Sequence, residues 1–315
     1  MRYRNLILAV LIVLVLPSQA VAQNAASLQK STDITGSELL KKLHSDYSEH
    51  NWAVAYITGI YTRHFNNGVI PGLDKREHFA DIVDYYVYTL NGKLDVPAQT
   101  LVIEAIKSAP ALIDAQKRLW TNAYKAAEVY FAQPSLLNAE KFCTALPNRR
   151  IPTLDDNGET RFQDLVFDFI APAHGPYDTP PPTLRKNFST IERDMDKGDP
   201  YAVEIMFRLY YFSDGAVAET ICFVLGKLMS THPHLFLQKL VGHEANLDGD
   251  DINSIVCMVS ELGEIPEAGD DPVKFKQIYD ERIMRRIKAL ESIDDPDLRE
   301  IRDRCLARLK AEKLL

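Results

Sequence analysis

Apolar residues recur along most of this chain at the three- and four-residue spacing of an amphipathic helix. Within residues 69–90, the stretch that follows Asp74 is one example, with apolar positions at Phe79, Ile82, Val83, Tyr86, Val87 and Leu90. This spacing places one stripe along one side of a helix. Asp74 and Glu77 have the spacing of a capping box, which fixes a helix start, and the Pro71-Gly72 turn lies just before them. The segment is therefore predicted to be a helix.

Similar units surround this segment and predict a bundle of four or five helices over residues 35–132. Thr35 and Glu38 have capping spacing ahead of Leu39, Leu40 and Leu43. The next stripe consists of Ala53, Tyr56, Ile57 and Ile60, and Gly59 on this helix would allow another helix to approach closely. Two further helices are predicted, one over residues 98–109 and one from about Pro110 to Ala132.

Residues 133–183 differ in composition from the segments on either side and are predicted to be a loop-rich connector. Residues 145–162 are rich in turn-forming residues, and Asp156-Asn157-Gly158 could close a hairpin or a loop. A short helical stripe follows at Phe162, Leu165, Val166, Phe169 and Ile170. Five prolines between residues 172 and 182 then predict a stiff, extended segment, which is either a hinge or an exposed binding loop.

Residues 184–315 are predicted to form a repeat-like array of short antiparallel helices. Asp199-Pro200, Asp271-Pro272 and Asp295-Pro296 each place a capping acid before a proline, which is the preferred start of a helix. Strand signals are nearly absent throughout. The predicted fold class is therefore all-α, with the N-terminal bundle followed by this array.

The first 22 residues have the features of a secretory signal peptide. Arg2 and Arg4 precede an apolar run over residues 6–16, and Ala20-Val21-Ala22 is a small-residue cleavage site. Cleavage before Gln23 would leave 293 residues (315 − 22 = 293), beginning with a flexible stretch over residues 23–34. An uncleaved anchor is the alternative, but the run is short for a bilayer span of about 20 residues. We expect a periplasmic protein without stable membrane insertion.

Charge and cysteine content narrow the partners that can be expected. The formal charge of −8 becomes about −10 when Arg2 and Arg4 are removed. An acidic surface argues against a nucleic-acid partner and suits a basic protein partner. Four cysteines, Cys143, Cys222, Cys257 and Cys305, are compatible either with disulfides in an oxidising compartment or with buried thiols.

Candidate metal sites fail on spacing. His243-Glu244 would need a histidine at position 247 to make the zinc-protease pattern, and that position is leucine. A looser site built from His232, His234 and His243 is a minor alternative to simple loop histidines. Residues 248–251 hold three aspartates but not the ligand order of a calcium loop, so an acidic helix cap is the preferred interpretation. No metal or other cofactor is predicted.

Nucleophile motifs and phosphate-binding glycine loops are also missing from the sequence, so no catalytic residue is predicted. Residues 280–288 and 297–313 alternate charges at helical spacing, which indicates exposed helix surfaces. Tyr and Phe side chains in residues 206–215 could line a groove, but core packing is the preferred interpretation. A hydrolase whose site is assembled from distant residues stays open as an alternative.

The order of the first four helical units resembles the Tai-type family of periplasmic immunity proteins, which neutralise type VI secretion amidase effectors. The resemblance spans residues 33–112 and is carried by Gly36, Leu39, Leu40, Tyr56, Gly59, Ile70, Pro71, Ile82, Val83, Pro97, Ala98, Leu101, Val102, Ala105 and Ile106. The family usually has cysteines at places equivalent to about His44, Val69 and Ala109, and this chain lacks them.

The resemblance implies an all-helical, non-catalytic protein that blocks a secreted peptidoglycan amidase, often as a homodimer. A rigid scaffold with projecting loops suits such an inhibitor, because prearranged loops lose less entropy on binding. Two loops are candidates by position, with tentative protein-binding residues Asn66, Asn67, Asn91 and Lys93. Structural connectors are the alternative for both loops. Residues 133–315 exceed what a dedicated inhibitor needs, so a periplasmic scaffold or adaptor is the alternative function.

Overall fold

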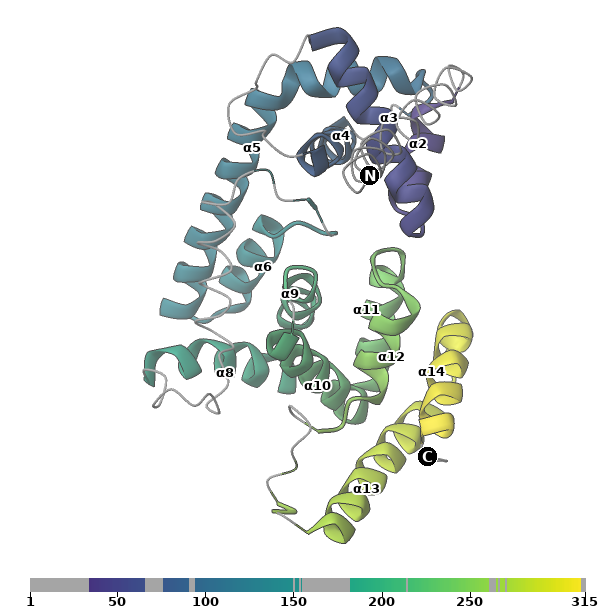
Figure 1. The fold of residues 1–315 in the computed structure, drawn as a ribbon. Helices are drawn as coiled ribbons and strands as arrows, with labels where there is room; N and C mark the ends of the chain where they lie inside the picture. Colours follow the sequence, from purple (N-terminus) through teal and green to yellow (C-terminus); the bar gives the residue numbers. More distant parts are fainter. Residues whose placement is uncertain are drawn as a thin grey trace, which may run out of the picture. The chain divides into compact units, whose positions relative to one another are not determined.

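The computed structural model describes residues 34–65, 76–90, 94–149, 151, 152, 154, 182–213, 215–260, 265, 267–269 and 271–312. All regular secondary structure in these residues is helical, as the sequence predicted (Figure 1). The α-helices are α2 (Gly36–Leu43), α3 (Tyr47–Phe65), α4 (Arg76–Leu90), α5 (Ala98–Ala132), α6 (Leu136–Ala145), α8 (Pro182–Asp196), α9 (Pro200–Tyr210), α10 (Gly215–Thr231), α11 (Pro233–His243), α12 (Gly249–Cys257), α13 (Pro272–Glu291) and α14 (Arg299–Glu312).

The chain divides into two compact units, and the division falls inside helix α5. The first unit consists of Met1–Gln116 with Ile151–Asp155, and the second of Lys117–Arg150 with Asp156–Leu315. The sequence pattern had placed a boundary at residue 132, where the apolar stripe of α5 ends. The stripe does not reveal that the last turns of α5 pack against later helices. Tyr130 illustrates this, because its hydroxyl donates a 2.9 Å hydrogen bond to Asp194 of α8.

The first unit has an apolar core built from one face of each of its helices. Helices α2 and α3 are in contact, as are α3 and α4. Most of the residues that carry the family resemblance are buried here: Gly36, Leu39, Leu40, Tyr56, Ile82, Val83, Ala98, Leu101, Val102, Ala105 and Ile106. The predicted stripes therefore point inward, and the resemblance rests on packing positions.

The start of α2 is fastened to the start of α5. Thr35 and Glu38 form the predicted capping box. Thr35 also forms an isolated bridge with Pro97, and the Gly36 amide donates to the Val96 carbonyl at 2.8 Å. A Cβ atom on Gly36 would lie 2.9 Å from the Cδ2 atom of Leu101, closer than packed atoms approach. Glycine at this position therefore permits the contact between the two helix starts.

The prediction that Gly59 allows a close helix approach is wrong. Gly59 is exposed on α3, and no described atom lies within 4 Å of where its Cβ would be. Its place in an aromatic-x-x-Gly pattern identified the helix but not the face that packs.

Helix α5 corrects the prediction of two helices that meet near Pro110. It is a single helix of 35 residues with Pro110 inside it. A proline in a helix interior costs about 3 kcal/mol because it lacks an amide hydrogen and crowds the preceding turn. Buried residues lie on both sides of it, including Ile106, Ala109 and Leu112. The burial of this continuous stripe offsets the local cost, so the helix does not break.

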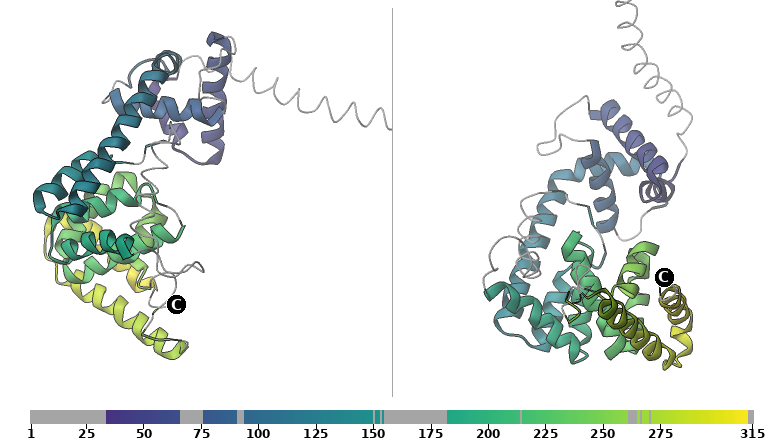
Figure 2. Two further views of the ribbon diagram at one scale, coloured as in Figure 1. Left: turned by 90° about the vertical axis from the view of Figure 1, so that its left-hand side faces the viewer. Right: turned by 60° about the horizontal axis from the view of Figure 1, so that its bottom comes forward.

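The second unit begins with the end of α5 and continues through α6 and α8 to α14 (Figures 1 and 2). Helix α6 lies inside the segment predicted to be a loop-rich connector. Ser135 caps this helix by accepting from the Asn138 amide, and Phe142 and Cys143 bury its inner face. That cap and the Ala139, Phe142, Cys143 spacing are ordinary helix signals, which the turn-rich residues after them obscured.

The predicted Asp-Pro helix starts are confirmed. The carboxylates of Asp199 and Asp271 accept amide hydrogens at the starts of α9 and α13. Asp295 caps a short 3-10 turn, Pro296–Leu298, that leads into α14. These caps satisfy amide hydrogens that have no partner within a helix, and each is worth about 1 kcal/mol.

Several predictions lie outside the described residues. They are the signal peptide, the Pro71-Gly72 turn with Asp74, the helix over residues 162–170 and the proline-rich connector up to residue 181. The last proline predicted for the connector, Pro182, instead begins α8. Among the described helices, none combines the length and apolar character that a membrane crossing requires.

Candidate functional site

The predicted protein-binding residues Asn66, Asn67, Asn91 and Lys93 also lie outside the described residues. No contact can therefore be assigned to them, and they stay predictions. The described residues instead present two polar features in the second unit, a buried network around Glu204 and an open pocket beside α13.

The three histidines considered as metal ligands lie at three separate places. His232 Nε2 is 2.9 Å from the Asp196 carbonyl oxygen, and His234 Nε2 is 2.9 Å from a carboxylate oxygen of Asp295. His243 is buried beside Glu204. In the described part of the chain, no group of three or more His, Cys, Asp or Glu side chains is placed to hold a metal ion.

The aspartates at residues 248–251 form a helix cap, as preferred from the sequence. The Asp248 carboxylate accepts hydrogen bonds from the amides of Asp250 and Asp251, and the Asp251 carboxylate accepts one from the Asp248 amide. The other carboxylate oxygen of Asp251 accepts from the Tyr210 hydroxyl at 2.7 Å, which ties α12 to α9. The cluster is therefore occupied by its own backbone and by α9.

All four cysteines are buried and unbridged, so the thiol alternative holds in this structure. Burial raises the pKa of Cys222 and of Cys305 to about 12 and that of Cys257 to about 11. The pKa of Cys143 is raised by the same cause. The thiolate is the nucleophilic form of cysteine. These four side chains are thus packing groups at neutral pH.

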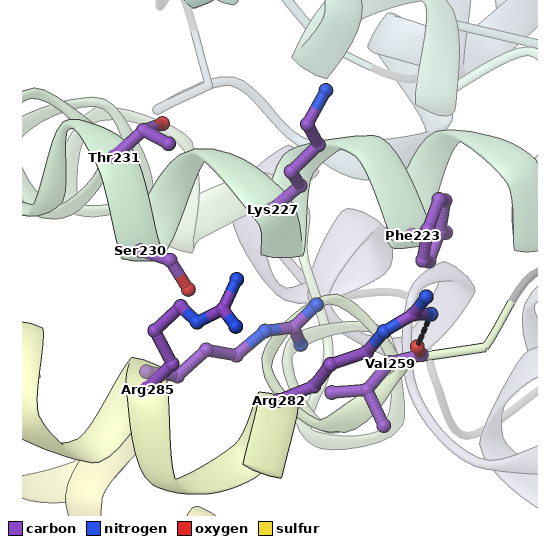
Figure 3. A pocket seen from close by; sticks show the side chains of 8 residues that line it. Phe223, Lys227, Ser230, Thr231, Val259, Arg282 and Arg285 are labelled. Carbon is purple, nitrogen blue, oxygen red and sulfur yellow. Dashed lines mark hydrogen bonds between the residues drawn. The ribbon is translucent and has the colours of Figure 1, made fainter. Parts of the chain in front are cut away.

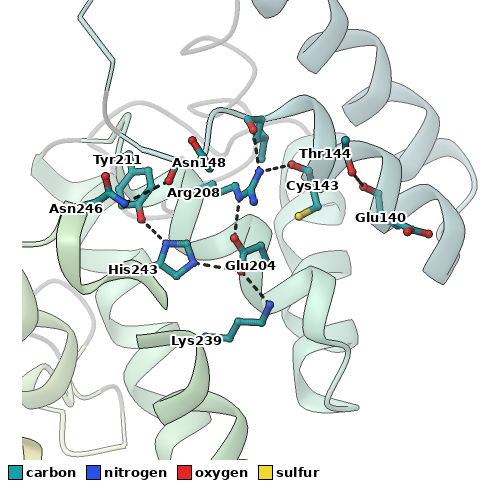
Figure 4. A network of polar contacts seen from close by, with 11 residues as sticks. Glu140, Cys143, Thr144, Asn148, Glu204, Arg208, Tyr211, Lys239, His243 and Asn246 are labelled. Carbon is teal, nitrogen blue, oxygen red and sulfur yellow. Dashed lines mark hydrogen bonds and ion pairs between the residues drawn. The ribbon is translucent and has the colours of Figure 1, made fainter. Parts of the chain in front are cut away.

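Glu204 lies at the centre of a largely buried polar network (Figure 4), in which His243 is buried and the Glu204 side chain is 16 % exposed. Its carboxylate accepts hydrogen bonds from Arg208 Nε at 2.8 Å and Lys239 Nζ at 2.9 Å, and His243 Nε2 lies 3.3 Å away. The His243 ring stacks on Phe207 and is hydrogen-bonded through Nδ1 to the Tyr211 hydroxyl. One carboxylate thus faces three nitrogen-bearing side chains.

The electrostatics of the network hold Glu204 ionised. Burial alone would raise the pKa of this carboxyl group, but the hydrogen bonds from His243, Lys239 and Arg208 outweigh it and hold the pKa well below its usual range. A carboxylate that stays ionised in this way is a poor proton shuttle at neutral pH, because it has no proton to give.

The same network joins three helices of the second unit. Arg208 extends from α9 and donates through Nη1 to the carbonyl oxygens of Cys143 at 2.7 Å and Leu146 at 2.9 Å. These carbonyls belong to the C-terminal end of α6. Lys239 and His243 belong to α11. The network therefore acts as a polar clamp between α6, α9 and α11.

A pocket of about 280 Å³ lies between α10 and α13 (Figure 3). Eight described residues line it: Phe223, Lys227, Ser230, Thr231, Val259, Arg282, Arg285 and Arg286. Four of these side chains are cationic and none is a carboxylate, a histidine or a cysteine. The pocket can attract and orient an anion, but these eight residues offer no acid–base pair for catalysis.

Arg286 forms the inner wall of this pocket. It is 3 % exposed, and its guanidinium donates to the carbonyl oxygens of Val256 and Met258, both at 2.7 Å. Those carbonyls end α12, where the helix dipole is negative. Gly226 makes room, because a Cβ there would lie 2.5 Å from Nη2 of Arg286. Burial lowers the pKa of Arg286 to about 9, so this side chain is still cationic at pH 7.

The other three cations are more exposed than Arg286. Arg282 donates to the Val259 carbonyl at 2.7 Å and to both carboxylate oxygens of Glu267, at 3.0 and 3.2 Å. Lys227 pairs with Asp196 at 3.3 Å, with both side chains about half exposed. Arg285 is exposed and forms no ion pair or hydrogen bond with any described residue.

The arrangement corrects the prediction that residues 280–288 form an exposed charged surface. Arg286 is buried and Arg282 is partly buried, while Arg285 faces the pocket. Charge alternation on one helix cannot reveal the carbonyl groups of a distant helix that accept from an arginine. Ser230, Phe223 and Gly226 on α10 likewise gave no functional signal in the sequence. The remaining sequence signal was three arginines at helical spacing, Arg282, Arg285 and Arg286.

Comparisons of the chain with known protein families, with curated proteins and with solved structures find no match. The resemblance of residues 33–112 to the amidase immunity family is thus a prediction that rests on the sequence pattern alone.

Proposed function

We propose that this is an exported, non-catalytic binding protein. The observation that carries the proposal is the contrast within the second unit between saturated reactive groups and an open cationic pocket. Glu204 and His243 are bonded to each other and to neighbouring helices, and the four thiols are buried with raised pKa values. The pocket between α10 and α13 offers positive charge, which suits recognition rather than turnover.

The partner favoured for the first unit is a secreted peptidoglycan amidase, blocked in the periplasm. The sequence resemblance supports this, and the packing of the unit makes it physically reasonable. Pattern residues from α2, α3, α4 and α5 converge in one core, and Gly36 allows the starts of α2 and α5 to touch. A core of this kind would hold the loops that follow α3 and α4 at fixed ends, which lowers the entropy lost on binding.

The experiment uses the mature protein, residues 23–315, and the secreted Cys–His amidase that the proposal expects to be encoded beside its gene. The whole mature chain is needed because α5 contributes to both units, so a fragment ending at residue 132 would remove the partners of Tyr130. Amidase cleavage of peptidoglycan peptides should fall to background at a one-to-one ratio. Full amidase activity at a large excess of the protein would refute the immunity role.

Loop residues supply the matched variants for this assay. Asn66→Ala with Asn67→Ala, and Asn91→Ala with Lys93→Ala, should weaken inhibition if the two predicted loops contact the amidase. Glu128→Ala, an exposed position on α5, should leave inhibition unchanged. Sedimentation of the protein alone would at the same time measure whether it is the homodimer that the resemblance implies.

A periplasmic scaffold or adaptor is the second candidate, favoured by exposed apolar side chains in the second unit. Val129, Leu136 and Leu137 are 51 %, 59 % and 58 % exposed around the turn between α5 and α6. A scaffold would capture an envelope protein through this surface, and Leu136→Ser with Leu137→Ser would abolish the capture. Unchanged capture by that double variant would exclude this surface as the docking site.

A further inference from the structure

We infer that the pocket between α10 and α13 is a binding site for a small phosphate monoester, in its dianionic form, that carries an apolar group. This site belongs to the second unit and does not depend on the amidase proposal for the first. The inference stands on the count of charges around the pocket, on the open donor groups and on the apolar end of the lining.

The charges of the described side chains around the pocket do not balance. Lys227, Arg282, Arg285 and Arg286 contribute four positive charges. Two described carboxylates pair with them, Asp196 with Lys227 and Glu267 with Arg282, and neither lines the pocket. The described residues thus leave an excess of two positive charges (4 − 2 = 2) in a protein whose formal net charge is −8. A dianion matches this excess, and a phosphate monoester carries about −1.5 to −2 charges at pH 7.

The cations differ in how firmly neighbouring groups hold them. Arg286 and Arg282 are held by backbone carbonyls, so their guanidinium groups lose little freedom when a ligand arrives. Arg285 is the open group, since it has no partner among the described residues. Figure 3 shows its guanidinium and the Ser230 hydroxyl directed toward the same part of the pocket. Arginine binds phosphate oxygens through two parallel N–H groups, and a hydroxyl can add a third hydrogen bond.

The volume and the remaining lining select the rest of the ligand. About 280 Å³ is many times the roughly 30 Å³ share of one water molecule, so the pocket exceeds a bare phosphate ion. It is slightly smaller than the usual range of small-molecule pockets, which begins at about 300 Å³, so the ligand should be compact. Phe223 and Val259 supply apolar surface beside the cations, and Arg282 lies over the Phe223 ring at 5.8 Å. A compact aromatic or aliphatic group on the phosphate would fit there.

The test is a calorimetric titration of the mature protein with phenyl phosphate, compared with inorganic phosphate and with phenyl sulfate. Phenyl sulfate has a similar shape but carries one charge. Phenyl phosphate should bind at least tenfold more tightly than either comparator at pH 7.5. Its advantage over phenyl sulfate should shrink at pH 5.5, because the second pKa of a phosphate ester is about 6. Equal affinity for phenyl phosphate and phenyl sulfate at pH 7.5 would overturn the dianion assignment.

Variants locate the binding. Arg285→Gln should weaken phenyl phosphate binding at least tenfold, and Lys227→Gln should weaken it less because Asp196 already pairs with that lysine. Arg118→Gln makes the same charge change at an exposed position of α5 that does not line the pocket, and it should alter affinity less than twofold. Both pocket positions are exposed, so the variants should melt within a few degrees of the wild type.

Two results would overturn the site. One is the absence of saturable phenyl phosphate binding by the wild-type protein up to about 10 mM, a concentration about ten times a Kd of 1 mM. The other is binding that Arg285→Gln and Arg118→Gln weaken equally, which would indicate a diffuse surface effect. Inorganic phosphate binding as tightly as phenyl phosphate would overturn the assignment of the apolar group.

Discussion

Each of the two units is stabilised internally by a different kind of contact. The first unit is an apolar core closed by a backbone contact between the starts of α2 and α5, in which Gly36 meets Leu101. The second unit has an apolar core as well, but Arg286 is buried within it and the Glu204 side chain is only 16 % exposed. Glu204 and its cationic partners join α6, α9 and α11. Arg286, on α13, donates a hydrogen bond to a carbonyl oxygen at the C-terminal end of α12.

This difference indicates where polar groups available for binding can be expected in a helical protein. In the first unit the packing between the described helices is mainly apolar, and the residues proposed to bind a partner follow α3 and α4 in the sequence. Buried charges require partners, since breaking a buried pair leaves an uncompensated charge. In the second unit that requirement organises the polar groups and leaves one arginine, Arg285, open in a pocket. Substitutions in each unit test whether this difference in packing governs stability.

The largest effect is expected from Glu204→Gln. Removing the carboxylate leaves Arg208, Lys239 and His243 facing one another without an anion, and such a loss costs about 3 kcal/mol or more. Urea unfolding followed by Trp120, which is buried against Phe212 in the second unit, should report this loss. Glu128→Gln, at an exposed site on α5, should change stability by less than about 0.5 kcal/mol.

A loss of under about 1 kcal/mol for Glu204→Gln would contradict the view that the second unit depends on this network. The same measurement followed by Trp52, which stacks on Tyr56 in the first unit, serves as the internal reference.

The next effect is expected from Gly226→Ala. The added methyl group would lie 2.5 Å from the Arg286 guanidinium and force it away from the carbonyls of Val256 and Met258. Overpacking and two lost acceptor contacts together should cost about 2 kcal/mol. Gly242→Ala on α11 meets no described atom within 4 Å and should instead stabilise its helix by up to about 1 kcal/mol. Thermal unfolding of the pair measures both, and shifts of the same sign would refute the account of Arg286.

In the first unit, Gly36→Ala and Gly59→Ala form the corresponding pair. A methyl group on Gly36 would press on Leu101 and on the Leu94 carbonyl, 2.9 and 3.1 Å away, and should cost about 1 to 2 kcal/mol. Gly59→Ala should stabilise α3 by up to about 1 kcal/mol, because helical alanine loses less entropy than glycine. Urea midpoints reported by Trp52 would check both values. If both variants prove neutral, the helix-start contact does not limit the stability of this unit.

The smallest effect is expected from Lys310→Ala. Lys310 pairs with Glu291 at 3.0 Å between α13 and α14, with the two side chains 56 % and 49 % exposed. Exposed pairs contribute little because water screens them, so the loss should be below about 0.5 kcal/mol. A loss comparable to that of Glu204→Gln would remove the distinction between buried and exposed charge on which the comparison rests.

The same distinction explains how far the sequence could predict this structure. Helix starts at Thr35, Asp199 and Asp271 depend on residues two or three apart, and local spacing identified them. The stripe of α4 was likewise readable from its apolar positions. The burial of Glu204 and Arg286 depends on carbonyls and side chains supplied by other helices. The charge pattern of one helix does not contain that information. The continuity of α5 through Pro110 was also unpredictable, because it depends on the burial of the residues on both sides of the proline.

The measurement that tests the comparison most directly is urea unfolding at pH 7 and at pH 3.5 in two single-tryptophan proteins. Trp120→Phe leaves Trp52 to report the first unit, and Trp52→Phe leaves Trp120 to report the second. The folded-state pKa of Glu204 lies below its unfolded value. Its stabilisation is therefore present above about pH 4.5 and is lost as the pH falls toward the folded-state value, at up to about 1.4 kcal/mol per pH unit.

Acid should consequently lower the Trp120 transition by about 1 kcal/mol or more relative to the Trp52 transition, and Glu204→Gln should remove most of that difference. Equal shifts of the two transitions, or a larger shift for Trp52, would contradict the claim that buried charge holds the second unit together.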